Sequence, residues 1–76
     1  PANGILNIEF DLDREERVIL SLKDMTGCRI EILADRTFPK GRKHLTADLS
    51  DLPSGGYLVT IRTGSMIQAL KVFKVN

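Results

Sequence analysis

The last third of the chain begins with Leu52-Pro53-Ser54-Gly55-Gly56-Tyr57-Leu58-Val59, and this stretch is the clearest indication of the fold. Proline fixes φ and the two glycines permit a sharp reversal, so its first half predicts a loop. The apolar and β-branched run that starts at Tyr57 predicts a strand, with the tyrosine ring over the edge of the core and its hydroxyl in water. A second strand over 67–75 follows a turn at 63–65, and the two strands form a hairpin.

Period-two alternation of apolar and polar residues continues through most of the remaining chain and never gives way to a helical period. It predicts half-buried strands over 5–12, 17–23 and 44–49. The residues expected to face the core are Leu6, Ile8, Phe10, Leu12, Val18, Leu20, Leu22, Leu45, Ala47 and Leu49.

Two interruptions of the alternation predict connections of different kinds. Asp24-Met25-Thr26-Gly27 reads as a tight hairpin turn, in which Gly27 takes a positive φ, and residues 28–33 form the return strand. Between 34 and 43 the alternation lapses, so we expect a longer connection that carries the chain from one sheet to the other. Six or seven short strands at roughly ten-residue spacing indicate an all-β chain folded as a small antiparallel β-sandwich.

Length and composition are those of a small globular domain. The 76 residues, of which 42% are hydrophobic and 28% charged, predict one packed domain over 1–76 and exclude a disordered chain. The chain starts at Pro1 with neither Met nor a signal-like stretch, so we expect a piece of a longer protein. A net charge of +1 and 5% aromatic residues argue against nucleic acid as a partner. No apolar run approaches the roughly 18 residues that span a bilayer.

The charges are unevenly distributed along the chain. Residues 1–24 carry six acids and three bases, whereas residues 52–76 carry three bases and no acid. Terminal strands of opposite sign that lie beside each other in one sheet would explain this pattern. The alternative is a basic C-terminal edge that faces an acidic partner.

The sequence offers no convincing catalytic set, cofactor site or metal site. His44 is the only histidine and falls on the outward face of its strand, so we interpret it as a surface residue. Cys28 is the only cysteine, which excludes an internal disulfide, and we expect a buried or half-buried thiol. Asp48 and Asp51 lack the further ligands that Ca²⁺ requires, and turn aspartates usually cap their own backbone. The chain is not expected to be an enzyme.

The order of these features resembles the type A C-terminal sorting domain of proteins exported by the type IX secretion system of Bacteroidota. The family opens with an element like Pro1-Ala2-Asn3-Gly4-Ile5-Leu6-Asn7-Ile8 and continues with an Asp-x-x-Gly turn like that in 22–29. A Leu-Pro-x-Gly-x-Tyr-x-Val segment matches 52–59, a turn glycine matches Gly64, and a basic-apolar terminal strand matches 71–75. The resemblance covers essentially the whole chain.

The resemblance implies an immunoglobulin-like β-sandwich that acts as an address label. The cargo domain that precedes it in the chain would cross the periplasm, pass the outer-membrane translocon, and be cut free by a sortase for surface attachment or release. The resemblance implies that the translocon and the sortase are the partners. The positions it implies for recognition by the translocon are Leu52, Pro53, Gly55, Tyr57, Val59, Gly64, Lys71, Val72, Phe73 and Lys74.

A final strand that is apolar along part of its length and carries lysines suits an edge that accepts another chain by strand addition. The same edge is compatible with a strand-swapped homodimer. The rival interpretation is a passive immunoglobulin- or fibronectin-like module of an extracellular enzyme, since sandwiches host many unrelated roles.

Overall fold

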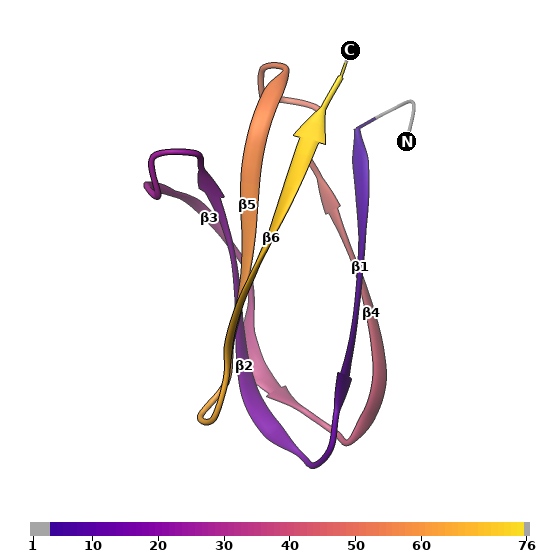
Figure 1. The fold of residues 1–76 in the computed structure, drawn as a ribbon. Helices are drawn as coiled ribbons and strands as arrows, with labels where there is room; N and C mark the ends of the chain where they lie inside the picture. Colours follow the sequence, from indigo (N-terminus) through magenta and orange to yellow (C-terminus); the bar gives the residue numbers. More distant parts are fainter. Residues whose placement is uncertain (1–3, 76) are drawn as a thin grey trace.

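The chain is all-β, as the alternation predicts, and the computed structural model describes residues 4–75 (Figure 1). The predicted opening element at 1–3 and the last residue, Asn76, lie outside the described residues. No helix of the described part is long and apolar enough to cross a membrane. The six strands are β1 (Ile5–Leu12), β2 (Glu16–Asp24), β3 (Arg29–Phe38), β4 (Gly41–Asp48), β5 (Gly55–Arg62) and β6 (Ile67–Lys74).

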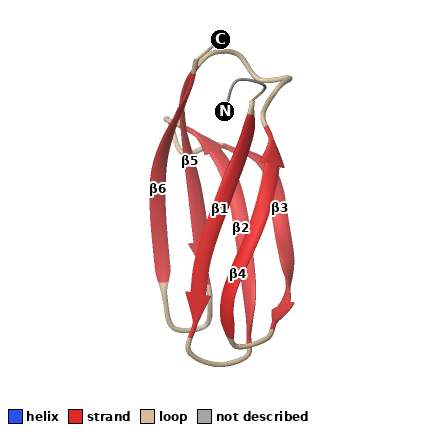
Figure 2. Cartoon of the chain, turned by 90° about the vertical axis from the view of Figure 1, so that its right-hand side faces the viewer, coloured by secondary structure: helices blue, strands red, loops and turns tan. Residues whose placement is uncertain are grey.

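The strands form two antiparallel sheets of unequal width. β1 pairs with β4 in a two-stranded sheet, and the other sheet has the order β3-β2-β5-β6. The narrow sheet lies across the broad one, with β3 and β6 at opposite sides of the molecule (Figure 2). This is the architecture of a small immunoglobulin-like β-sandwich. Because the narrow sheet has only two strands, it leaves part of the broad sheet uncovered.

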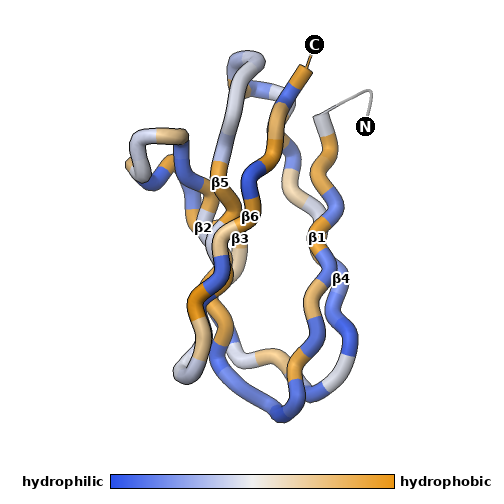
Figure 3. Tube along the Cα trace, viewed as in Figure 1, coloured by the Kyte–Doolittle hydropathy of each residue, from blue (hydrophilic) through white to orange (hydrophobic). Residues whose placement is uncertain are grey.

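The core lies between the sheets and consists mainly of residues that the alternation places inward, joined by Phe38, from the stretch where the alternation lapses, and by Tyr57. Val18, Leu20 and Leu22 of β2 are completely buried, and the alternation of apolar and polar residues along the strands is visible in Figure 3. Leu6, Phe10 and Leu45, at the other predicted inward positions, are partly buried against this core. The buried core residues are Ile8, Leu12, Val18, Leu20, Leu22, Phe38, Ala47, Leu49, Tyr57 and Val59.

The prediction of a long connection over 34–43 was wrong. β3 runs on to Phe38, and β4 already begins at Gly41, so the chain changes sheet across Pro39 and Lys40. The reason is a pair of register shifts against β2, which leave Ile30 and Leu33 without a direct partner. After each extra residue, the side chains that had pointed to one face of the sheet point to the other. The apolar-polar alternation in β3 is therefore broken although the strand is continuous.

The β2–β3 turn forms where it was predicted, with Gly27 at φ 90°. Asp24 organises this turn, since its Oδ1 accepts hydrogen bonds from the backbone N–H of Thr26 at 2.9 Å and of Cys28 at 3.1 Å. The Thr26 hydroxyl donates to the same oxygen, and this bond is the main reason why the pKa of Asp24 lies below its ordinary value. The carboxylate therefore stabilises the folded state.

We expect Asp24→Asn to lower the melting temperature at pH 7 and to have progressively less effect in acid. The contribution of a carboxylate with a lowered pKa is present above its ordinary pKa of about 4 and is lost as the pH falls through the lowered value. Thermal unfolding followed by circular dichroism between pH 7 and pH 2 measures the difference between wild type and variant. Asp13→Asn, at an exposed position of the β1–β2 turn, is the control. A difference that stayed constant across this range would contradict the prediction.

Candidate functional site

The predicted recognition residues fall into two groups, and the first holds one loop in place. Tyr57 is buried, and its hydroxyl donates a hydrogen bond to the Pro53 carbonyl instead of lying in water as predicted. Lys74, at the end of β6, donates from Nζ to the carbonyls of Leu52 and, at 3.2 Å, Ser50. The loop between β4 and β5 is therefore fixed by one side chain from each strand of the last hairpin.

Asp48 is the last residue of β4, and its side chain caps the backbone at the start of the same loop. Its Oδ1 accepts a hydrogen bond from the Ser50 amide at 2.9 Å. Hydrogen bonds from the Ser50 side chain and backbone lower the pKa of Asp48, and the charge of Lys74 adds to this effect. Within residues 4–75, no group of three or more His, Cys, Asp or Glu side chains is arranged to hold a metal ion. Asp48 therefore caps the start of the loop that follows β4, as expected for an aspartate next to a turn.

The two glycines of the predicted set differ in what their backbone requires. Gly55 has φ 151°, a conformation that other residues rarely adopt, and it begins β5. Gly64 lies in the β5–β6 turn with a negative φ and with open space where a Cβ would stand. The turn is closed by the Thr63 N–H, which donates to the Met66 carbonyl at 2.9 Å. Position 64 is therefore exposed, and neither its backbone conformation nor the space around it requires a glycine.

The second group of predicted residues is presented on β6. Val72 lies opposite Tyr57 and packs against the core, whereas Lys71 and Phe73 point to the outer face of the broad sheet. Phe73 is 70% exposed although it packs beside Met25 over Gly56, where a Cβ would come within 3.3 Å of the phenylalanine ring. Lys71 and Phe73 are therefore the residues of the predicted set whose side chains β6 exposes.

The sequence did not identify a further apolar surface along β6. Leu70 lies opposite the buried Val59 and points to the same, inner face of the broad sheet, yet its side chain is 60% exposed. The narrow sheet stops at β1, and in Figure 2 β6 stands beside β1 at the edge of the broad sheet with no strand of the narrow sheet in front of it. A groove of about 470 Å³ lies there between β1 and β6, and its lining includes Phe10, Ile61, Met66 and Leu70. We call it the β1–β6 groove.

A family model described as the secretion system C-terminal sorting domain matches residues 1–75. The chain belongs to this family. The sorting domain is the C-terminal signal carried by cargo of the type IX secretion system, so the resemblance seen in the sequence is confirmed. Searches of curated proteins and of solved structures found no match.

The family is a signal rather than a catalytic domain, and the two candidate reactive side chains of this sorting domain belong to different sheets, His44 to the narrow one and Cys28 to the β2–β3 hairpin of the broad one. His44 is exposed on β4, as predicted, with Nε2 3.2 Å from Oδ1 of Asn7. Cys28 is exposed beside the β2–β3 turn, so the prediction of a buried or half-buried thiol was wrong. The reason is that the hairpin tip projects beyond the region in which the two sheets pack (Figure 1).

The predicted pairing of the acidic first strand with the basic last strand was also wrong. β1 pairs with β4, and β6 belongs to the other sheet. Arg42 of β4 instead neutralises the acids of β1, with ion pairs of 3.0 Å to Glu9 and 3.2 Å to Asp11. The basic residues of β6 in the sorting domain are therefore not used to balance β1.

We expect Tyr57→Phe to lower the free energy of unfolding of the sorting domain by about 1 kcal/mol, because it leaves the Pro53 carbonyl without its donor. Lys74→Met keeps most of the side-chain stem and removes the bonds to the same loop. Since both residues fix one loop, the effects of the two substitutions should not be additive. Urea unfolding of wild type, both single variants and the double variant measures this coupling. Unchanged midpoints in the single variants would show that the loop does not depend on these bonds.

Proposed function

We propose that residues 1–76 form a single domain, attached behind a cargo protein, whose strand β6 is the part read by the type IX translocon. Membership of the family implies export to the cell surface or secretion. Recognition through β6 is supported by the exposure of its apolar side chains, since Ile67 is 72%, Phe73 70% and Leu70 60% exposed. Large apolar side chains gathered on one edge strand are typical of a surface that another protein covers.

The backbone of β6 supports recognition by strand addition. β6 pairs with β5 on one side only, so the amide and carbonyl groups of its other edge have no strand partner within the described residues. An added strand would satisfy these groups and lie over the β1–β6 groove, covering Leu70 and Met66. Lys71 and Lys74 interrupt the apolar side chains of β6, which is how natural edge strands limit indiscriminate pairing.

The other predicted recognition residues would act by shaping this edge. Leu52 and Pro53 are fixed by Tyr57 and Lys74, and Val59 anchors β5 in the core. β6 pairs with β5 along its whole length, from Lys74 opposite Gly55 to Ile67 opposite Arg62. The Leu-Pro-x-Gly-x-Tyr-x-Val segment thus sets the position of β6 rather than contacting the translocon.

The proposed sequence of events starts with passage of the cargo through the periplasm. The translocon then binds the folded domain, and a sortase removes it and attaches the cargo to the surface or releases it. The domain itself performs no chemical step in this scheme. Its contribution is a folded surface that persists until it is recognised.

A reporter fusion tests this function. Residues 1–76 are placed behind a signal peptide and a fluorescent protein, and fluorescence is measured at the surface and in the medium. We expect export in a strain with an intact type IX system and retention in a strain that lacks the translocon. Retention in both strains would favour a passive immunoglobulin-like module.

A further inference from the structure

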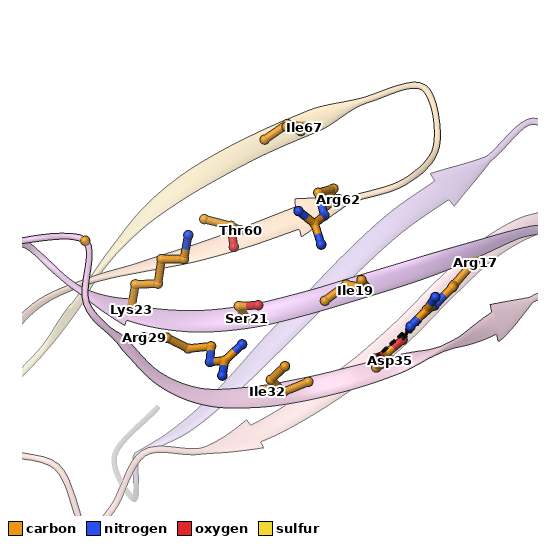
Figure 4. Close-up of a pocket in the computed structure, with 11 residues that line it drawn as sticks. Arg17, Ile19, Ser21, Lys23, Arg29, Ile32, Asp35, Thr60, Arg62 and Ile67 are labelled. Carbon is orange, nitrogen blue, oxygen red and sulfur yellow. Dashed lines mark hydrogen bonds and ion pairs between the residues drawn. The ribbon is translucent and has the colours of Figure 1, made fainter.

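We propose that the outer face of the broad sheet binds an acidic, extended segment of a partner protein. This face carries a hollow of about 740 Å³ that lies on the side away from the narrow sheet. We call it the cationic hollow; Figure 4 shows its side chains, which come mainly from β2, β3 and β5. The lining residues proposed to contact the acidic segment are Lys23, Arg29, Arg62, Ser21, Thr60 and Ile19.

The charges of the cationic hollow are only partly balanced within the domain, since one carboxylate lies among four basic side chains. Asp35 is the one carboxylate in its lining, and its Oδ1 pairs with Arg17 at 2.9 Å. Within residues 4–75, Lys23, Arg29 and Arg62 have no carboxylate within ion-pair distance. Elsewhere the domain does pair its basic residues, as it does Arg42 with Glu9 and Asp11.

The arrangement of two of these cations is unfavourable in the free protein. Lys23 of β2 and Arg29 of β3 are direct cross-strand partners. Like charges directly opposite each other destabilise a sheet, whereas opposite charges stabilise it. An anion held between the two side chains would convert this repulsion into attraction. The pair is therefore better suited to a bound anion than to the stability of the free domain.

The spacing of the cations matches an extended polypeptide. Arg62 lies at the level of Ile19, four residues along β2 from Lys23 and Arg29. At a strand rise of about 3.3 Å per residue, the two charged levels are about 13 Å apart. Carboxylates four residues apart on an extended chain have the same separation.

The surface between the two charged levels favours a protein over an acidic polysaccharide. Ser21 and Thr60 lie opposite each other there, and Ile19 and Ile32 flank them. Hydroxyls and branched aliphatic side chains suit the backbone and side chains of a peptide, whereas a glycan would be expected to stack on aromatic rings, and none lines the hollow. The hollow lies on the opposite face of the broad sheet from the β1–β6 groove, and Ile67 is the β6 residue in its lining, so binding there can be tested separately from the groove.

The test uses the purified chain and a fluorescein-labelled peptide with two pairs of glutamates four positions apart, separated by valine and threonine. We expect binding by fluorescence anisotropy that weakens with salt, and no binding of the analogue in which glutamine replaces glutamate. Lys23→Gln with Arg29→Gln should weaken binding about tenfold, as expected when two charged contacts are removed. Arg14→Gln with Lys40→Gln makes the same change in net charge outside the hollow and should leave the affinity within about twofold.

Arg29→Thr supplies a second readout that a purely structural role would not produce. Because it removes the repulsion of Lys23, it should raise the melting temperature of the free domain while weakening binding of the peptide. Equal losses of binding in the hollow variant and the control variant would overturn the proposed surface. Binding of dextran sulfate through the hollow without binding of the acidic peptide would overturn the proposed class of partner.

Discussion

A reporter fused to the domain without residues 71–76 should remain inside the cell, with export reduced to the level of a strain that lacks the translocon. The deletion removes the second half of β6, including the exposed Phe73 and the Lys74 contact with the Ser50–Leu52 loop. It removes Val72, which packs partly buried against the core, but none of the buried core residues, which lie on other strands and in the loop that follows β4. We therefore expect loss of recognition in a domain whose core still packs, and export at the wild-type level would contradict the role of β6.

Two single substitutions, compared in the same export assay, distinguish loss of recognition from loss of folding. Phe73→Asp changes an exposed apolar side chain on edge strand β6, and Ile30→Asp changes one on edge strand β3 of the same sheet. We expect the first to block export and the second to be exported normally. Circular dichroism of both purified variants checks that the sheets are intact. Equal export of the two variants would show that the apolar surface of β6 is not read.

The largest expected effect on stability is that of Leu20→Ala. Leu20 lies in the central strand of the core and has 0% of its surface exposed. Leu→Ala at such a position costs about 2–5 kcal/mol, a large part of the roughly 4–11 kcal/mol expected for a domain of this length. We expect the free energy of unfolding to fall by about 2–5 kcal/mol, measured by urea unfolding of wild type and variant.

Leu70→Ala is the matched control, because it makes the same chemical change on the same side of the same sheet. Leu70 is 60% exposed, so the free energy of unfolding should change by no more than about 0.5 kcal/mol. Its export, in contrast, should fall if the β1–β6 groove is covered by the translocon. Similar losses of stability in the two variants would mean that β6 is part of the core.

The contrast between Leu20 and Leu70 also marks how far the sequence predicts this fold. Alternation correctly places Val18, Leu20 and Leu22 inward, because β2 is regular and has a paired strand on each side. The same alternation cannot distinguish Leu70, since its exposure depends on the width of the opposite sheet. Strand β3 was missed beyond Leu33 because its two extra residues disturb the period that defines a strand in a sequence.

The candidate site was predictable to the extent that its residues lie in one segment. The loop over 52–56 and the strand after it follow from proline, glycine and a run of β-branched residues. The attachment of Lys74 to that loop joins residues 22 or more positions apart, and no local pattern encodes it. The cationic hollow likewise assembles Lys23, Arg29 and Arg62 from three strands, and the sequence displays only their separate charges.

β2 and β6 differ in how many neighbours hold them. β2 is bonded to β3 and β5, whereas β6 is bonded to β5 alone and contributes none of the buried core residues described. Local opening of β6 therefore exposes little of the core, and its amide hydrogens should exchange with solvent through fluctuations that leave β2 protected. The strand that carries the exposed apolar side chains is thus also the strand whose local opening requires the least free energy.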